Sequence, residues 1–319
     1  MNKVAIKTTD LKKLMKSVCK KHRISSFECK PIVQNYLEAE LLGKRTHGVA
    51  KFCFESRFFS DRVGKPLVVA DTGPLLKLDG NKEVGPLAAD YCVSLCVERA
   101  KKYGVCILGL NNIQRYGILS TWVKRFAENH LFGLVMNTCE PAMTGYQGKK
   151  RVLGTNPIAF AIPTEEKTYI VDMATSKVAM SLIWQALEEQ KPLPNNTFYD
   201  EKGEVTINPK QAKAVQHFGG IKGFSIALLV QLLTGSIFNF KMASRIRCMY
   251  DIGYIFFAID PAKVTKIDSM LKSNQSLLDE LSESGSLIPG SRSANLKRSN
   301  KILINKNVLE ELQNLGGTT

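Results

Sequence analysis

The sequence predicts an α/β protein, because helix-like and strand-like segments alternate through residues 85–176. Residues 87–104 carry apolar side chains at helical spacing and end in a glycine, and the buried strand run 105–112 follows directly. A helix over 117–130 and a strand over 131–138 repeat this order. Strands and helices in this alternation form a sheet with helices packed on its faces.

The segments before this central region predict helices followed by strands. The expected order is a helix from Thr9, a helix over 25–43 stopped by Gly43, a turn and an aromatic, basic helix over 44–64, and strands within 66–80.

The segments after the central region predict mostly helices. The expected order is a helix from Val178, an exposed loop over 192–209, a glycine turn that opens a long buried helix after residue 220, a strand over 253–261, a helix over 261–285 and a basic tail. We expect residues 1–75 to be an N-terminal helical part that packs with the C-terminal helices, 76–245 a central α/β cofactor-binding domain, and 246–319 a C-terminal strand and helices.

The bulk composition is that of a soluble globular protein. The chain has 319 residues, of which 44% are apolar and 23% charged, which suits one large or two moderate domains. No apolar run reaches the roughly 18 residues of a membrane helix, and the basic N-terminus lacks the apolar core of a secretory signal. We therefore expect neither a membrane segment nor secretion.

The cysteine and histidine content and the net charge further restrict the class of protein. Eight cysteines without a CxxC pair, mostly inside apolar segments, indicate a reduced, cytoplasmic protein, and four histidines argue against a metal centre. The net charge of +15 is spread along the chain, which favours a solvated basic surface over a nucleic-acid interface. Such a surface also attracts anionic ligands, such as dinucleotides and small carboxylates.

Two strand-and-turn segments carry the first indication of function. Residues 154–163, GTNPIAFAIP, and 172–176, DMATS, each join an apolar strand to a turn of small polar residues. Such turns let backbone N–H groups approach a ligand closely, although each turn alone is also compatible with an ordinary strand end. With no GxGxxG and no GxxxxGK[ST] in the chain, the pair indicates a nucleotide site of a non-Rossmann kind.

Two further segments are candidates for phosphate binding and proton transfer. FGGIKG combines flexible glycines, Lys222 and a following helix N-terminus, which suits a phosphate. His47, in the basic turn KRTHGV, is the best acid or base for a carbonyl group. His217 is a second candidate, and the other two histidines are expected to be structural. Each feature also has a purely structural interpretation: FGGIKG can be a tight junction between a loop and a helix, and His47 can be a surface histidine in a basic turn.

The order THGV, GTNPIAFAIP, DMATS, FGGIKG, GYIFFAIDP and IPG resembles the malate/L-lactate/sulfolactate dehydrogenase family over nearly the whole chain. This family includes ureidoglycolate dehydrogenase, 2,3-diketo-L-gulonate reductase and the cyclic-imine reductases. The resemblance implies a mixed, non-Rossmann central sheet of the sulfolactate-dehydrogenase type, flanked by N- and C-terminal helices. It also implies a homodimer, NAD or NADP as cofactor, and hydride transfer to or from a 2-oxo or 2-hydroxy acid.

The resemblance also implies site residues at matching positions. His47 matches the catalytic histidine, with Thr46 where serine is usual. Matches to cofactor-holding segments are Asn137, Thr138, Thr155, Asn156, Pro157, Asp172, Met173, Ala174, Thr175, Ser176, Lys222, Gly223, Pro289, Gly290 and Ser291. Substrate carboxylates would be held by Thr46, Lys51, Arg115 and Arg45.

Four positions depart from the family pattern. Arg115 replaces a histidine that acts as acid or base in several relatives, and an arginine cannot exchange protons near neutral pH but can bind a carboxylate bidentately. Lys51 replaces an arginine, and Glu55 replaces a tyrosine. Ser291 begins a segment where relatives usually carry an acidic residue, which suits the more anionic NADP, although the choice between NAD and NADP stays open.

These departures leave several functions open. The first is an active reductase in which His47 donates the proton and the basic residues anchor the substrate. A cyclic-imine carboxylate is an alternative substrate, because its C=N beside a carboxylate has the geometry of a 2-oxo acid. The second function is a cofactor-binding homologue with impaired catalysis. The third is a basic nucleic-acid-binding module.

Overall fold

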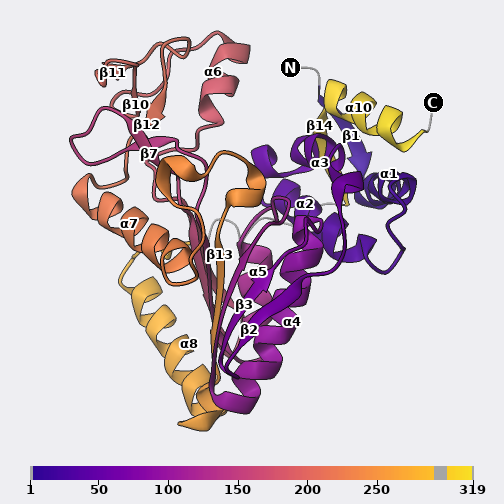
Figure 1. Ribbon diagram of the computed structural model, residues 1–319, viewed down its shortest axis with the longest axis vertical. Helices are drawn as coiled ribbons and strands as arrows, with labels where there is room; N and C mark the ends of the chain where they lie inside the picture. The colour runs from indigo at the N-terminus through magenta and orange to yellow at the C-terminus, as the bar shows by residue number, and fades with distance from the viewer. Residues whose placement is uncertain (1–2, 291–299, 318–319) are drawn as a thin grey trace.

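A seven-stranded mixed sheet forms the centre of the molecule (Figure 1). The computed structural model describes residues 3–290 and 300–317. The strand order is β2-β3-β4-β13-β5-β8-β9, in which β3 and β4 are parallel and the other neighbouring pairs are antiparallel. The strands are β2 (Leu67–Asp71), β3 (Leu75–Asp79), β4 (Val105–Asn111), β13 (Tyr254–Ile259), β5 (Phe132–Asn137), β8 (Ile158–Ile162) and β9 (Tyr169–Met173). This arrangement confirms the predicted α/β class with a mixed sheet.

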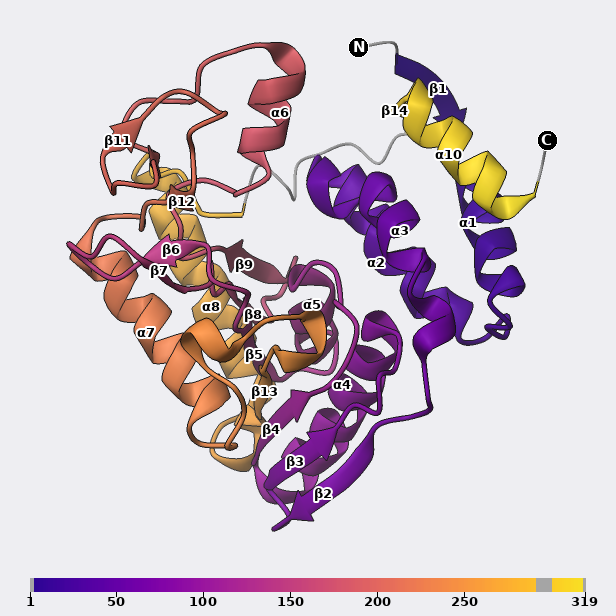
Figure 2. The same cartoon turned by 45° about the horizontal axis from the view of Figure 1, so that its top comes forward.

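Helices cover both faces of the sheet. Because successive side chains of a strand point to opposite faces, Phe256 of β13 joins the core under α4 (Gly85–Tyr103) and α5 (Ser120–Ala127). The preceding Ile255 packs on the other face, in a cluster with Val230 of α7 (Ile221–Gly235). Figure 2 shows α4 and α5 on one side of the strands and α7 on the other.

A second core joins the two ends of the chain. It lies between α1 (Thr8–Lys21), α2 (Cys29–Leu41), α3 (Val49–Ser56) and α10 (Lys306–Gly316), beside the paired strands β1 (Lys3–Lys7) and β14 (Lys301–Asn305). The prediction of a basic tail is therefore wrong for residues 301–316. Ile302 and Ile304 alternate inward in β14 and are buried, so this segment pairs with β1 despite its flanking lysines.

A third group of elements forms a lobe beside the sheet, at the upper left of Figure 1. It contains β6 (Met143–Thr144), β7 (Arg151–Leu153), α6 (Leu182–Glu189), β10 (Phe198–Tyr199), β11 (Val205–Thr206) and β12 (Ala214–Val215). The predicted exposed loop over 192–209 is wrong, because it contributes β10 and β11 to a three-stranded sheet. Phe198 is fully buried, and the Asp200 carboxylate accepts hydrogen bonds from two backbone N–H groups of the hairpin turn.

The helix α7 differs from the prediction of a long buried helix. Val230 packs on the central sheet and Ala227 in the hydrophobic cluster of the lobe, but Leu228, Leu229 and Leu232 are exposed. The helix α8 (Ile267–Glu283) has no fully buried residue. Continuous apolar sequence therefore does not by itself distinguish a helix buried in the chain from one with an uncovered apolar side.

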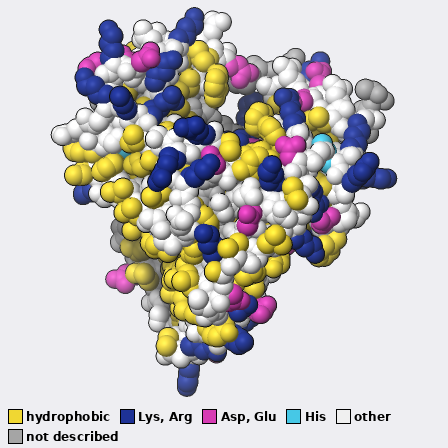
Figure 3. Space-filling model, viewed as in Figure 1, with side chains coloured by type: hydrophobic (Ala, Val, Ile, Leu, Met, Phe, Trp, Pro, Cys, Tyr) yellow, Lys and Arg dark blue, Asp and Glu magenta, His cyan; other side chains and the backbone are white. Residues whose placement is uncertain are grey.

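Basic side chains are spread over the face drawn in Figure 3 and are interspersed with acidic ones. Within the described residues, no helix has the length and apolar character needed to cross a bilayer. No group of His, Cys, Asp and Glu side chains in this part of the chain is placed to hold a metal ion.

Candidate active site

The turn that carries His47 is fixed by a buried carboxylate. A short 3-10 helix, η1 (Arg45–His47), links α2 to α3. Glu40 of α2 is buried, and its Oε2 accepts a hydrogen bond from the Val49 N–H at 2.9 Å, which caps the start of α3. A Cβ placed on Gly48 would lie 2.1 Å from the same oxygen. The glycine after His47 is therefore required for this close approach.

His47 is exposed, yet its surroundings favour the neutral imidazole. Thr46 Oγ1 lies 3.1 Å from its Nδ1. Protein atoms around the ring displace water and lower the pKa of His47, and the charges of Lys44 and Lys51 act in the same direction. Asp172 opposes this shift. A histidine in this state can accept a proton at neutral pH.

The carboxylate of Asp172 connects the His47 turn to the sheet. Its Oδ2 lies 2.6 Å from Lys44 Nζ and accepts a hydrogen bond from the Ser120 N–H, at the start of α5, at 3.1 Å. Asp172 is the first residue of the DMATS segment and the second-last residue of β9, which ends at Met173. One side chain therefore joins the turn before His47, the N-terminus of α5 and a predicted cofactor segment.

The cations predicted to hold substrate are already paired. Lys51 Nζ lies 2.9 Å from Glu55 Oε1, one helical turn away in α3. Arg115 Nη1 lies 3.6 Å from the same oxygen, and Arg115 Nη2 donates a hydrogen bond to Glu140. Burial disfavours the charged guanidinium, but the charges of Glu140 and Glu55 outweigh it and raise the pKa of Arg115. Arg45 is more open, with its side chain 55% exposed and its Nε 4.0 Å from Glu40.

The predicted cofactor turns converge. The Thr155 carbonyl accepts hydrogen bonds from Thr175 N–H at 2.9 Å and from Thr175 Oγ1 at 2.8 Å. The Thr175 carbonyl in turn accepts one from Phe218 N–H at 3.2 Å, so the GTNP, DMATS and FGG turns are neighbours. Ser176 forms an isolated antiparallel bridge with His217. Turns separated by some 60 residues in sequence thus form one surface.

Several polar side chains predicted to hold the cofactor instead hold these turns together. The Asn156 amide accepts a hydrogen bond from Cys139 N–H and donates one to the Ala227 carbonyl of α7. Asn137 accepts a hydrogen bond from the Tyr116 hydroxyl at 2.8 Å, and Thr138 bonds to the backbone of Gly253. All three side chains are buried, so they position the backbone of these turns.

The remaining predicted cofactor residues lie at the edges of this surface. Gly223 is buried at the start of α7, where a Cβ would lie 2.1 Å from the Phe218 carbonyl oxygen. Gly290 has φ +86°, and a Cβ there would lie 2.2 Å from the Ile170 carbonyl oxygen of β9. Ala174 and Pro157 are half-buried, and Met173, Lys222 and Pro289 are exposed. Ser291, with its proposed preference for NADP, lies outside the described residues.

The start of α7 fits the phosphates of a dinucleotide. Gly219 and Gly220 have φ of +54° and +62°, and a Cβ on either would find no atom nearer than 3.8 Å, so their backbone is open. His217 is buried, and its Nε2 has no hydrogen-bond partner among the described residues. An open backbone at a helix N-terminus beside a buried unpaired nitrogen suits an anionic ligand.

Three residues of the site were not singled out from sequence. Lys44 was named only as a neighbour of His47, Ser120 acts through its backbone, and Glu140 pairs with Arg115 across 25 residues. Glu140 lies two residues after the Asn137–Thr138 segment, and that position was the available signal. Lys44 and Asp172 are 128 residues apart, so no local sequence pattern indicates that they pair.

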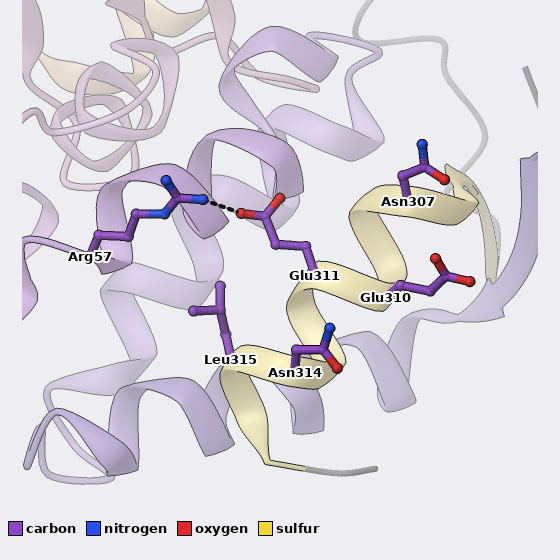
Figure 4. A pocket seen from close by; sticks show the side chains of 6 residues that line it. All are labelled: Arg57, Asn307, Glu310, Glu311, Asn314 and Leu315. Atoms are coloured by element: carbon purple, nitrogen blue, oxygen red, sulfur yellow. Dashed lines mark hydrogen bonds and ion pairs between the residues drawn. The ribbon is translucent and has the colours of Figure 1, made fainter.

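Two surface pockets lie away from this cluster. One lies against α10 and is lined by Arg57, Asn307, Glu310, Glu311, Asn314 and Leu315 (Figure 4). The other lies between α2, α4 and α5 and includes Phe27, Tyr91 and Arg125. Neither contains a predicted site residue.

Comparisons with known proteins identify the family of the chain. The family model described as malate/L-lactate dehydrogenase matches residues 6–313. A malate/(S)-sulfolactate dehydrogenase of Methanothermus fervidus is 28% identical over 296 residues, which cover 88% of this chain and 87% of the relative. The sulfolactate dehydrogenase structure from Methanocaldococcus jannaschii aligns with a TM-score of 0.90 at 26% identity, over 98% of this chain and 97% of that one.

A Delta(1)-pyrroline-2-carboxylate reductase of Burkholderia ambifaria is 28% identical over 231 residues, or 68% of each chain. Other relatives are named as NADP+- and NAD+-dependent dehydrogenases. The chain belongs to the malate/L-lactate dehydrogenase family. The expectations of a dehydrogenase or reductase and of a nicotinamide cofactor are thereby confirmed at the level of the family.

We predict that Asp172→Asn lowers the pKa of His47 further, because it removes the negative charge that favours the imidazolium. The pKa is read from the imidazole resonances of the four histidines in an NMR titration. Glu311→Gln removes a carboxylate that pairs with Arg57 on α10 and should leave the pKa of His47 unchanged. A rise, or no shift, in Asp172→Asn would contradict an electrostatic effect of Asp172 on His47.

Proposed function

We propose that the chain transfers hydride between NAD or NADP and a small 2-oxo or 2-hydroxy acid, with His47 exchanging the proton. The observation that carries this proposal is the link from Lys44 to Asp172. It holds the proton-exchanging imidazole beside the strand that leads into the DMATS turn, where the resemblance expects the cofactor. Family membership supports the reaction class.

Cofactor binding, substrate binding and proton exchange would fall to different residues of the site. The bound cofactor supplies hydride chemistry at its nicotinamide ring. The backbone of the GTNP, DMATS and FGG turns would hold it, while Arg45 and Thr46 lie on the His47 turn within reach of a substrate carboxylate. Arg115 keeps its proton, because its pKa is raised, so the proton exchange falls to His47 alone.

The lowered pKa of His47 sets the pH dependence of the oxidation and of the reduction of the substrate. Oxidation of a hydroxyl needs the neutral imidazole, so its rate falls as pH drops through the pKa of His47, below the usual value near 6.5. Reduction needs the imidazolium and slows as pH rises through the same pKa.

Two alternatives keep specific support. A cyclic-imine carboxylate as substrate is supported by the similarity to the pyrroline-2-carboxylate reductase. A catalytically impaired cofactor-binding protein is supported by the replacement of a histidine by Arg115. Tight NAD(P)H binding without oxidation by a panel of 2-oxo acids and cyclic imines would favour the second alternative.

We further propose a homodimer in a reduced, cytoplasmic setting. The uncovered side of α7 supports the dimer, because Ile221, Leu228, Leu229 and Leu232, together with Ile237 just beyond the helix, are between 39% and 59% exposed. An apolar patch of this kind marks a protein interface. Six of the eight cysteines are buried as free thiols among apolar side chains, which supports a reducing compartment.

Substitution of His47 tests the proposed chemistry. His47→Ala should lower kcat by about 10²- to 10⁴-fold, the usual contribution of a positioned acid or base, with cofactor affinity nearly intact. Steady-state kinetics and a fluorescence titration with NADH and NADPH measure the two quantities. His22→Ala is the control, because His22 instead contacts Ser60. Unchanged turnover in His47→Ala would remove His47 from the mechanism.

Substitution on α7 tests the dimer. Leu229→Lys places a charge in the proposed interface and should convert a dimer to a monomer in sedimentation velocity. Leu303→Lys, at an exposed position in β14, should leave the dimer intact. A wild-type chain that sediments as a monomer at micromolar concentration would refute the proposal.

A further inference from the structure

Four charged side chains of the site cancel one another. The cations Lys51 and Arg115 alternate with the anions Glu55 and Glu140 in one connected network. The sequence led to the expectation that both cations bind substrate, but each already has a carboxylate of the chain beside it. A substrate that enters this region meets a neutral group rather than two spare positive charges.

Because the Glu55 carboxylate is buried, the four-residue network keeps its ion pairs and stays neutral. Glu55 is 1% exposed, whereas the side chains of Lys51, Arg115 and Glu140 are about one third exposed or less. Neither carboxylate oxygen of Glu55 accepts a hydrogen bond from the described residues, so the charge of this carboxylate is balanced by the ion pairs of its Oε1 with Lys51 and Arg115. Removing a cation from a buried anion is costly, because the anion then remains unpaired in a poorly solvated place.

The neighbouring cation is also occupied. Lys44 is paired with Asp172 at 2.6 Å. Arg45 is the more open of the site's cations, since its side chain is 55% exposed and 4.0 Å from Glu40. One carboxylate can therefore be held at the His47 turn by Arg45 and Thr46. A second anionic group directed at Arg115 would approach the carboxylates of Glu140 and Glu55 and be repelled by them.

We propose that Glu55 and Glu140 make the site selective for substrates with a single negative charge over dianionic ones. Malate and sulfolactate, named for relatives of this chain, each carry two acid groups. In this chain the carboxylates of Glu55 and Glu140 take the place of a substrate's second acid group on Lys51 and Arg115. This inference rests on the proposed function, since it assigns the substrate class of the same site.

The experiment compares a monoanionic and a dianionic substrate in the wild-type enzyme and in Glu140→Gln. The wild type should have a higher kcat/KM for pyruvate than for oxaloacetate. Glu140→Gln removes the charge paired with Arg115 Nη2 without changing side-chain size, and should shift the ratio toward oxaloacetate by about tenfold, the effect of one partly buried ion pair. Glu55→Gln should shift it in the same direction.

A matched control separates this local effect from a change of net charge. Glu311→Gln makes the same chemical change at a carboxylate paired with Arg57, in the pocket against α10 (Figure 4). It should leave the ratio unchanged. An equal shift in Glu311→Gln would show that net charge, rather than the network, sets the preference, and would overturn the proposal.

Binding provides a readout that does not depend on turnover. Calorimetry in the presence of NADH compares oxamate, a monoanion, with tartronate, a dianion. Tighter binding of oxamate by the wild type and a shift toward tartronate in Glu140→Gln are expected. A wild-type preference for the dianion, or a ratio unaffected by Glu140→Gln, overturns the inference. Absence of turnover with every 2-oxo acid would instead refute the proposed function, and the binding ratio would still decide the selectivity.

Discussion

The arrangement of the site depends on the carboxylate of Asp172. It accepts hydrogen bonds from Lys44 and from the backbone N–H of Ser120, and it lies in the last part of β9. These contacts join the helical block made by the two ends of the chain to the edge strand of the central sheet. Without them, the His47 turn would be fixed only from its own side, by Glu40 and the close packing of Gly48.

The second constraint is electrostatic. Each of the cations Lys44, Lys51 and Arg115 has an anionic partner within the chain. The site is therefore organised by paired charges in spite of the net charge of +15. The positive charge of the surface as a whole attracts anions at long range, while the local pairs select among them at short range.

Much of the fold was predictable from local sequence pattern. The alternation through residues 85–176 predicted the right class, and the turns around Thr155 and Thr175, which the sequence predicts to belong to one site, are joined by hydrogen bonds. These features are local, since a turn needs particular residues within a few positions. The predictions failed where pairing is long-range, as for Ile302 and Ile304 in β14, whose partner strand lies at the other end of the chain.

Long-range pairing also limited what the sequence could predict about the site. His47 and Arg115 could be named from their motifs, but Arg115 forms ion pairs with Glu140 and Glu55, which reach it from other elements. The motif predicted a substrate-binding cation at this position but not that carboxylates of the chain already pair with it. It likewise named Asn156 as a cofactor residue, whereas its side chain is used to join Cys139 to α7.

A crystal structure of the chain with NADH and oxamate tests the central claim most directly. The account predicts the cofactor against the GTNP, DMATS and FGG turns, with the His47 ring within roughly 3–4 Å of the oxamate carbonyl oxygen and Lys44 still on Asp172. A complex in which oxamate and the nicotinamide lie beyond hydrogen-bond reach of His47, with Asp172 released from Lys44, would contradict it.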